Sequence, residues 1–412
     1  MEALACGGMA EHARVTTCSV QGLGRISSVT VAADGTIFAC TDSAIYCLSD
    51  ISCCPVRIAG HVTDEGCKDG RGNEARFRGP RGIAVDRDGK ALLVADTGND
   101  VVRRVLLAGS EAMVVSTIAG CAETAGFVDG VGQVARFNRP AGIVVDRKGI
   151  ILVTDSLNHA VRMISPCDGR VTTLAGGAVG FEDGPGATAR FNSPFGIALD
   201  KDGNAVVADV ANHCIRLLAR SASCVVISTI AGRGEVQGFC DGDCGDALFN
   251  NPRDVAVEGC DRILVADASN HRVRMVSHSR GGGIVTTVAG SGARGKVDGA
   301  GPAADFDRPW ALSLGPRGRL LVACFHSFGC LRVVGVAFPW RLARVLYIGV
   351  LKARGDSELG ESVTDSNPLL PRASTSSCPL ALLPTEGGNG LVCPLLEKIL
   401  GMLDCGFLPH LL

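Results

Sequence analysis

The sequence has 412 residues, and its 40 Lys and Arg nearly balance its 42 Asp and Glu. With 46 % hydrophobic residues, this balance excludes an intrinsically disordered chain and argues against a nucleic-acid binder that relies on bulk positive charge. The 54 glycines are about twice the usual share and follow no three-residue period, which excludes collagen. Many glycines with only 4 % aromatic residues favour short strands joined by tight turns.

No signal for export or for a membrane span is found. Residues 1–21 lack the apolar core and basic start of a cleavable signal peptide. The most apolar window, 333–351, is interrupted by Pro339, Arg341 and Arg344. The 19 cysteines include no two pairs at zinc-binding spacing. We therefore expect reduced, buried thiols and a cytoplasmic protein.

An internal repeat organises most of the chain. Segment 128–164 returns at 182–218, more loosely at 240–276, and in further copies at 68–106 and 297–334. One aromatic residue recurs at steps of 60, 54, 58 and 57 residues, as Phe77, Phe137, Phe191, Phe249 and Phe306. A proline follows three residues later in every copy. Periods of this length indicate a repeat architecture.

Each unit is predicted to contain four short strands. In the third copy they are 196–200, 204–209, 214–218 and 224–232, with tight turns at 200–203 and 210–213. A long stretch rich in Gly and Asp then leads to the next unit. One unit cannot bury both faces of its sheet, whereas neighbours stacked around an axis can, as in the blades of a propeller.

The units predict an all-β fold, a six-bladed β-propeller of four-stranded antiparallel blades over residues 13–337. A shorter first unit without the long insert brings the number of blades to six. Residues 13–20 resemble a fourth strand without a blade of its own, so we expect them to complete the last blade and remove free sheet edges. Segment 344–351 is the competing closing strand. The blades are predicted at about 26–60, 80–120, 140–176, 194–232, 252–290 and 309–337.

The ends of the chain fall outside the repeats. Residues 1–12 are an N-terminal extension, and 338–412 form a tail without the repeat pattern. Residues 367–390 read as a linker, and 394–403 as one short amphipathic helix. We expect the tail to be partly disordered, and the helix either docks on the propeller or a partner or stays disordered.

The repeated motifs resemble the NHL repeat family of β-propellers. They read P-x-G-[IV]-x-[VL]-D, then V-[AT]-D-x-x-N-H, and are clearest in 128–163 and 182–217. The DG-x-G-x-x-A-x-F insert is similar to a long-loop subtype. The resemblance covers about residues 15–337 and implies a rigid platform that binds protein or, in some members, RNA. Similar propellers include lactonase-type hydrolases and an amidating lyase.

Acidic and basic residues recur seven positions apart. Each Asp ends a predicted second strand and each Arg lies on the third, so the pair is expected to form an ion pair within its blade. The alternative is a ring of carboxylates that binds a cation. Cys324 replaces the Asp in the last blade. The aspartates are Asp96, Asp155, Asp209 and Asp267, and the arginines are Arg103, Arg162, Arg216 and Arg274.

Three other sets of residues keep the register of the repeat. The recurring phenylalanines are expected to fill the seams between blades, and the Asp-Gly pairs of the inserts are interpreted as turns. Asn-His pairs in the second turn suit a structural turn or an exposed contact surface. Their places on separate blades argue against one shared metal ion. These binding-face candidates are Asn158, His159, Asn212, His213, Asn270 and His271.

Binding is the favoured function. No phosphate-binding loop, nucleophile elbow or paired catalytic Cys and His is found, so we expect no catalytic residue, cofactor or metal. The predicted innermost strands are apolar except at Asp254. We therefore expect a scaffold that binds a protein partner through its insert-bearing face, because loops on a rigid frame usually carry binding. A metal-dependent hydrolase or lyase in the central channel and an RNA-binding propeller are the alternatives.

Overall fold

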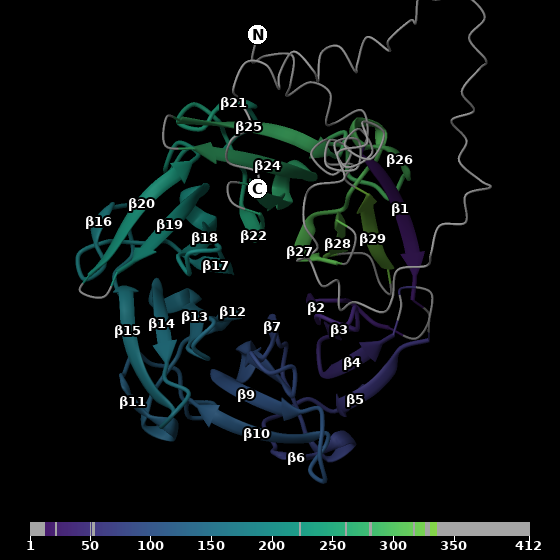
Figure 1. The fold of residues 1–412 in the computed structure, drawn as a ribbon, viewed down its shortest axis with the longest axis vertical. Coiled ribbons are helices and arrows are strands. Elements are labelled where there is room, and N and C mark those ends of the chain that lie inside the picture. The colour runs from purple at the N-terminus through teal and green to yellow at the C-terminus, as the bar shows by residue number, and fades with distance from the viewer. Residues whose placement is uncertain are drawn as a thin grey trace, which may run out of the picture. The chain divides into compact units, whose positions relative to one another are not determined.

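The computed structural model contains six antiparallel sheets arranged around a central axis (Figure 1). It describes residues 13–20, 23–49, 51, 54–221, 224–259, 262–279, 282–315, 318–325 and 330–335. These belong to one compact unit, Met1–Leu346, and the second unit, Tyr347–Leu412, lies outside the described residues. The predicted six-bladed β-propeller is confirmed. The helix expected at 394–403, the tail and the competing closing strand at 344–351 all lie outside the described residues.

In blades 1 to 5 the four main strands follow the chain from the axis outward, and in blade 6 the N-terminal strand takes the outermost of these four places. Blade 1 comprises β2 (Ser28–Val31), β3 (Ile37–Cys40), β4 (Ala44–Leu48) and β5 (Val56–Gly60); blade 2 comprises β7 (Gly82–Val85), β8 (Ala91–Asp96), β9 (Val101–Leu106) and β10 (Val114–Ala119). Blade 3 comprises β12 (Pro140–Val145), β13 (Ile151–Asp155), β14 (Ala160–Ile164) and β15 (Arg170–Gly176); blade 4 comprises β17 (Pro194–Leu199), β18 (Ala205–Asp209), β19 (Cys214–Arg220) and β20 (Val225–Ala231). Blade 5 comprises β22 (Pro252–Glu258), β23 (Arg262–Asp267), β24 (Arg272–Ser279) and β25 (Gly282–Ala289); blade 6 comprises β27 (Pro309–Leu314), β28 (Arg319–Cys324), β29 (Cys330–Gly335) and β1 (Arg14–Ser19). Among the described residues, no helix is long and apolar enough to span a membrane.

Five blades have a fifth strand that the sequence did not predict. A two-residue strand from the preceding insert pairs with the outermost strand of each of these blades. The pairing occupies backbone groups on an outer edge that would otherwise be free to pair with another chain. Blade 1, which lacks the long insert, keeps four strands. The added strands are β6 (Gly70–Arg71), β11 (Gly130–Val131), β16 (Gly184–Pro185), β21 (Gly242–Asp243) and β26 (Gly299–Ala300).

The N-terminal strand completes the last blade. β1 pairs antiparallel with β29, with Val15 opposite Val334 and Thr17 opposite Arg332. The backbone N–H and the hydroxyl of Thr17 also donate to the carboxylate of Asp298, at 2.9 and 2.7 Å. The first and last strands of the propeller are therefore neighbours in one sheet.

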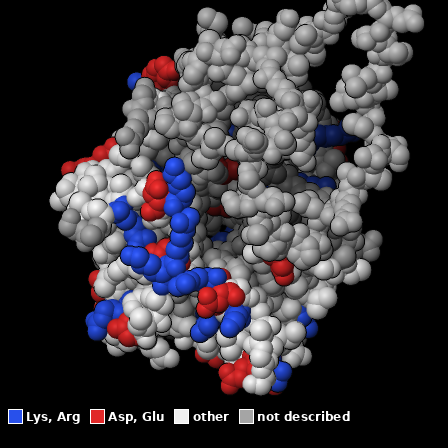
Figure 2. Space-filling model, viewed as in Figure 1, with Lys and Arg blue, Asp and Glu red and all other residues white. Residues whose placement is uncertain are grey.

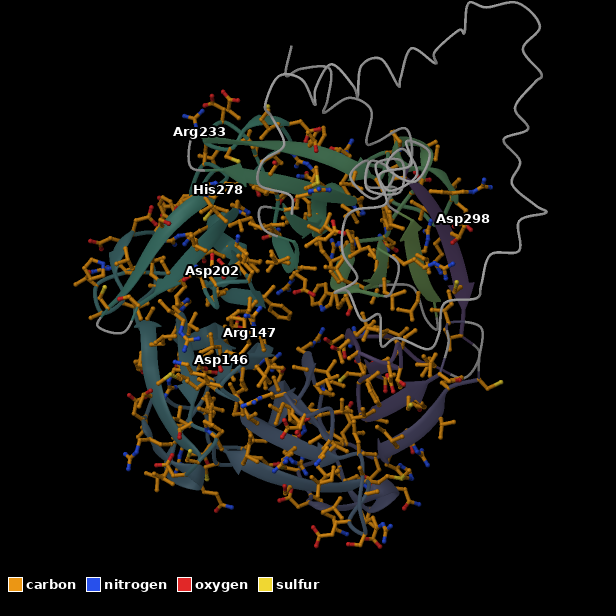
Figure 3. All side chains as sticks on the ribbon, in the orientation of Figure 1. Asp146, Arg147, Asp202, Arg233, His278 and Asp298 are labelled. Atoms are coloured by element: carbon orange, nitrogen blue, oxygen red, sulfur yellow. The ribbon has the colours of Figure 1, made fainter. Side chains whose placement is uncertain are left out.

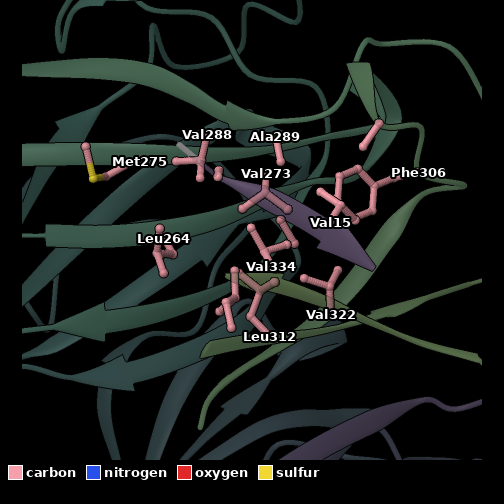
Figure 4. Close-up of a cluster of buried hydrophobic side chains, with 14 of the residues drawn as sticks. Val15, Leu264, Val273, Met275, Val288, Ala289, Phe306, Leu312, Val322 and Val334 are labelled. Atoms are coloured by element: carbon pink, nitrogen blue, oxygen red, sulfur yellow. The ribbon is translucent and has the colours of Figure 1, made fainter. Parts of the chain in front are cut away.

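The hydrophobic core is divided among the seams between blades. At the seam between blades 5 and 6, Phe306 packs with Val273 of β24, Val322 of β28 and Val15 of β1 (Figure 4). The recurring phenylalanines are fully buried at successive seams, where each ring lies between strands of two blades. Each ring therefore stabilises the contact between two sheets that share no hydrogen-bond ladder.

Glycine allows neighbouring innermost strands to approach closely. A Cβ atom on Gly82 would overlap the backbone carbonyl of Ala141, and one on Gly142 would overlap that of Phe195. The Pro-x-Gly motif is therefore a packing requirement at the axis. Blade 5 has Asp254 at this position, and its carboxylate instead accepts the N–H of Leu312 in blade 6, at 2.8 Å.

Candidate functional site

The second turns and the ends of the inserts lie together on one side of the ring. Leu157 N–H in the second turn of blade 3 donates to the carbonyl of Asn138 at the end of an insert, at 3.1 Å. Gly98 N–H donates in the same way to Arg78, at 2.8 Å. We call this side the insert-bearing face.

The opposite side, the short-turn face, carries the turns at 86–90, 146–150 and 200–204. Arg147 lies there at the inner end of blade 3 (Figure 3). Lys and Arg side chains gather on this face over blades 3 and 4, with acidic side chains among them (Figure 2).

The recurring Asp and Arg meet inside each blade. In blade 3, Nη1 of Arg162 lies 2.7 Å from Oδ2 of Asp155, and both side chains are fully buried. The corresponding pairs join Arg103 to Asp96, Arg216 to Asp209 and Arg274 to Asp267, at 2.7–2.9 Å. Burial raises the pKa of Asp155 to about 6, although hydrogen bonds from Asn158, Asn138 and Arg162 oppose that shift. The carboxylates are held separately, each by its own blade.

The aspartates of the inserts have a role that the sequence did not reveal. Asp129 accepts Nη2 of Arg162 at 2.7 Å, and it also accepts the N–H and hydroxyl of Thr173 in the outermost strand, both at 3.0 Å. The insert is thus tied to the third and fourth strands of its blade. In blade 6, where Cys324 replaces the inner carboxylate, Arg332 still pairs with Asp298 at 3.0 Å. The equivalents are Asp69, Asp183, Asp241 and Asp298.

A second set of aromatic rings, which the sequence did not predict, packs on the recurring arginines. The guanidinium carbon of Arg216 lies 5.0 Å from the ring centre of Phe181 and 5.1 Å from that of Phe191. Phe127 and Phe239 stack on Arg162 and Arg274 in the same way. Each of these rings precedes its seam phenylalanine by ten residues, which was the available signal.

The asparagines of the second turns are hydrogen-bonded within the propeller. The amide of Asn212 donates to Asp209 and to the carbonyl of Gly180, both at 2.8 Å, and its side chain is fully buried. Asn158 and Asn270 make the equivalent pairs of bonds. These amides join each second turn to the insert beside it.

The histidines of the second turns connect neighbouring blades. His159, His213 and His271 have φ values of 52°, 55° and 55°, the left-handed conformation. Nδ1 of each ring accepts a backbone N–H from the next blade, namely from Ser193, Asn251 and Arg308, at 3.1–3.2 Å. Asp100 makes the same link from blade 2 to Arg139, at 2.7 Å. We call these contacts the blade latches.

The latch histidines are expected to make folding stability sensitive to acid. Burial lowers the pKa of His159, His213 and His271 below the ordinary value of 6.5. A protonated imidazole has no acceptor for the backbone N–H, and each lost bond costs about 0.5–1.5 kcal/mol. Because the folded-state pKa lies below the unfolded value, this stability is complete above about pH 6.5 and is lost as the pH falls through the folded-state pKa.

Replacing all three histidines by Asn should reduce this sensitivity. Asn suits a positive φ, keeps an acceptor oxygen and does not titrate. The buried aspartates whose pKa is raised to about 6 are present in both proteins, so their opposite effect cancels in the comparison. When the pH is lowered from about 7.5 to 5, the Tm of the parent should fall more than that of the triple variant, as measured by thermal unfolding. Parallel pH profiles would contradict the latch role.

The six innermost strands surround a central channel, and one end of this channel opens on the insert-bearing face. The side chains at this end differ from one blade to the next. The residue after each recurring proline lies there, and in chain order these are Arg81, Ala141, Phe195, Arg253 and Trp310. The guanidinium of Arg253 lies 4.4 Å from the ring centre of Phe195 and 4.0 Å from that of Trp310. Arg81 approaches the same indole at 5.4 Å from blade 2. We call Arg81, Phe195, Arg253 and Trp310 the channel-end cluster.

The repeats of this chain also occur in known proteins. The family model described as NHL repeat matches residues 137–162 and 191–216. NHL repeat-containing protein 2 of Bos taurus is 32 % identical over 200 residues, which are 46 % of this chain and 27 % of that protein. The chain contains NHL repeats. Protein SUPPRESSOR OF QUENCHING 1, chloroplastic, of Arabidopsis thaliana is 32 % identical over 34 % of this NHL repeat protein and 14 % of its own length. The chain spans less than half of the length of these curated relatives.

Solved structures share the fold of this NHL repeat protein. An auxiliary nutrient binding protein from Bacteroides ovatus superposes with a TM-score of 0.59 at 15 % identity, over 79 % of this chain and 77 % of that one. A gluconolactonase from Xanthomonas campestris gives 0.53 at 14 % identity, over 82 % and 93 %. At sequence identities this low, the similarity shows only that these proteins share a fold. Within the described part of the NHL repeat protein, no group of three or more His, Cys, Asp or Glu side chains could hold a metal ion.

Proposed function

We propose that this NHL repeat protein is a binding scaffold whose insert-bearing face docks a protein partner. The observation that carries the proposal is a set of exposed apolar side chains beside the second turns. Leu157, in the second turn of blade 3, is 50 % exposed, and Val179 and Val236, in neighbouring inserts, are 56 % and 44 % exposed. All three belong to second turns or inserts of the insert-bearing face, and exposed apolar side chains on one face favour a protein interface.

The frame beneath these side chains supports the proposal. Backbone N–H of Gly177 donates to the carbonyl of His159 at 3.1 Å, and that of Glu235 donates to Asn212 at 2.9 Å. Both inserts are therefore fixed to second turns, and the latches fix those turns to the next blade. A surface held in this way loses little conformational entropy when a partner binds.

Exposed arginines indicate the charge of the partner. Arg139 and Arg308 are exposed where the insert returns to the innermost strand. Their backbone N–H groups are held by the latches at Asp100 and His271. We expect a partner with an apolar patch bordered by acidic side chains, because complementary charges at the rim of an interface steer association.

A pair of charge-matched double variants tests the docking face. Leu157→Glu with Val236→Glu lowers the net charge by two on the insert-bearing face, and Arg147→Gln with Lys148→Gln does so on the short-turn face. Proteins captured from a cell extract by the parent are identified and purified, and their affinities for all three proteins are measured by titration calorimetry. The first double variant should bind at least about 10-fold more weakly than the parent, while the second should match it. Undiminished binding by the first variant, or a loss confined to the second, would contradict the proposed face.

A further inference from the structure

The channel-end cluster presents hydrogen-bond donors that no described residue accepts. Nη1 of Arg81 and Nε1 of Trp310 are buried without a hydrogen-bond partner. Within the described residues, the guanidinium of Arg253 makes ring contacts and no hydrogen bond. Buried polar groups are ordinarily satisfied, and an unsatisfied charged group is costly to the fold. The cluster therefore lacks acceptors.

The nearby carboxylates are already engaged. Asp42 accepts Nε and Nη2 of Arg25, at 3.1 and 2.5 Å. The two oxygens of Asp254 accept the backbone N–H groups of Val255 and Leu312, at 2.9 and 2.8 Å. Within the described residues neither acid is hydrogen-bonded to Arg81 or Arg253, although the charge of Asp42 partly offsets that of Arg81.

The arginines also lie close enough to repel each other. Burial lowers the pKa of Arg253 to about 10, and the charges of Arg81 and Arg308 add to the shift. Burial, followed by the charge of Arg25, likewise lowers the pKa of Arg81. Both guanidinium groups still carry a positive charge at neutral pH, and of the described carboxylates only that of Asp42 is seen to offset the charge of either one, so the channel end keeps a net positive charge.

A cavity of about 370 Å³ adjoins the cluster along the axis. It is lined by all six innermost strands, including Ile83, Ile197 and Val255, and by Arg81, Phe195 and Trp310 of the cluster. This volume falls within the range of small-molecule sites, which typically combine an apolar lining with a few convergent polar groups.

We propose that the central channel binds a small organic carboxylate. The carboxylate oxygens accept hydrogen bonds from Arg81, Arg253 and the indole N–H of Trp310, and the aliphatic or aromatic body of the molecule lies between the innermost strands. A guanidinium pairs with both oxygens of a planar carboxylate through two parallel N–H bonds. It pairs with a phosphoryl group in the same way, so inorganic phosphate is one of the ligands tested below. This site goes beyond the docking of a protein on the insert-bearing face and does not depend on it.

The fluorescence of Trp310 provides the test. Trp340 is the second of the two tryptophans, so a Trp340→Phe background leaves Trp310 as the sole indole. The protein is titrated with succinate and benzoate, with their uncharged amides, with inorganic phosphate and with hexaglutamate. At least one small carboxylate should give a saturable change that its amide does not give. Arg81→Gln and Arg253→Gln should each weaken it about 10- to 100-fold, while the short-turn variant Arg147→Gln should not.

A charge-retaining variant separates binding from structural damage. Each variant must first unfold cooperatively, and Arg253→Lys should then recover part of the affinity that Arg253→Gln loses. Three results would overturn the proposal: no saturable change with either carboxylate, equal affinity in the parent and Arg253→Gln, or binding of phosphate or hexaglutamate alone. None of these results bears on the docking face, which calorimetry with the partner tests separately.

Discussion

Deleting residues 1–20 should abolish the closed propeller. This deletion removes β1, whose six residues pair with β29 and whose Val15 is buried in the seam with blade 5. It also removes Thr17, which holds Asp298 beside Arg332. The free edge of β29 would then be open to pairing with other chains. We expect aggregation on size-exclusion chromatography and loss of the cooperative thermal transition.

A shorter deletion is the matched control for this experiment. Removing residues 1–12 leaves β1 intact, so that protein should stay monodisperse and unfold like the parent. If the chain without residues 1–20 were equally soluble and stable, another segment would be filling the place of β1. Residues 344–351 are the segment whose sequence suits that place.

Replacing Phe191 by Ala should cost about 3–5 kcal/mol of unfolding free energy. Its ring is fully buried at the seam between blades 3 and 4, packed with Val161, Ile197 and Val207, and a cavity there cannot collapse without moving two sheets. Denaturant unfolding measures the loss of unfolding free energy, provided that parent and variant show the same dependence of that free energy on denaturant concentration.

Phe181→Ala is the matched control for the seam. Phe181 and Phe191 lie at nearly the same distance from the guanidinium of Arg216, but only Phe191 is fully buried. The Phe181→Ala variant should lose about 1 kcal/mol of unfolding free energy, which is the typical contribution of a partly exposed cation–π contact. Equal losses in the two variants would show that stacking on Arg216, rather than filling of the seam, accounts for the role of Phe191.

The fold was largely predictable because its signals are local and repeated. The 54- to 60-residue steps of the phenylalanines and the alternation of short strands and turns are properties of each unit, and they suffice for six blades. The short outer strand β11 was not predictable, because its two residues, Gly130 and Val131, have no strand pattern of their own. Pairing with β15 alone makes this segment a strand.

The candidate site was less predictable because it depends on contacts between blades. The sequence placed His213 in a turn, but nothing local indicates that its ring accepts the N–H of Asn251, 38 residues further along the chain. Asp129 is a similar case, since its partners Arg162 and Thr173 follow it by 33 and 44 residues. The channel-end cluster had one visible signal. The residue after each recurring proline is apolar in three copies, as Ala141, Phe195 and Trp310, and is a charged Arg only at 81 and 253.

Backbone hydrogen exchange in the complex with a purified partner tests the docking face most directly. Binding on the insert-bearing face should slow exchange in the second turns, at 97–100, 156–159, 210–213 and 268–271, and in the adjoining inserts. The turns of the short-turn face, at 86–90, 146–150 and 200–204, should exchange as they do in the free protein. Protection confined to the short turns, with the second turns unchanged, would contradict the account.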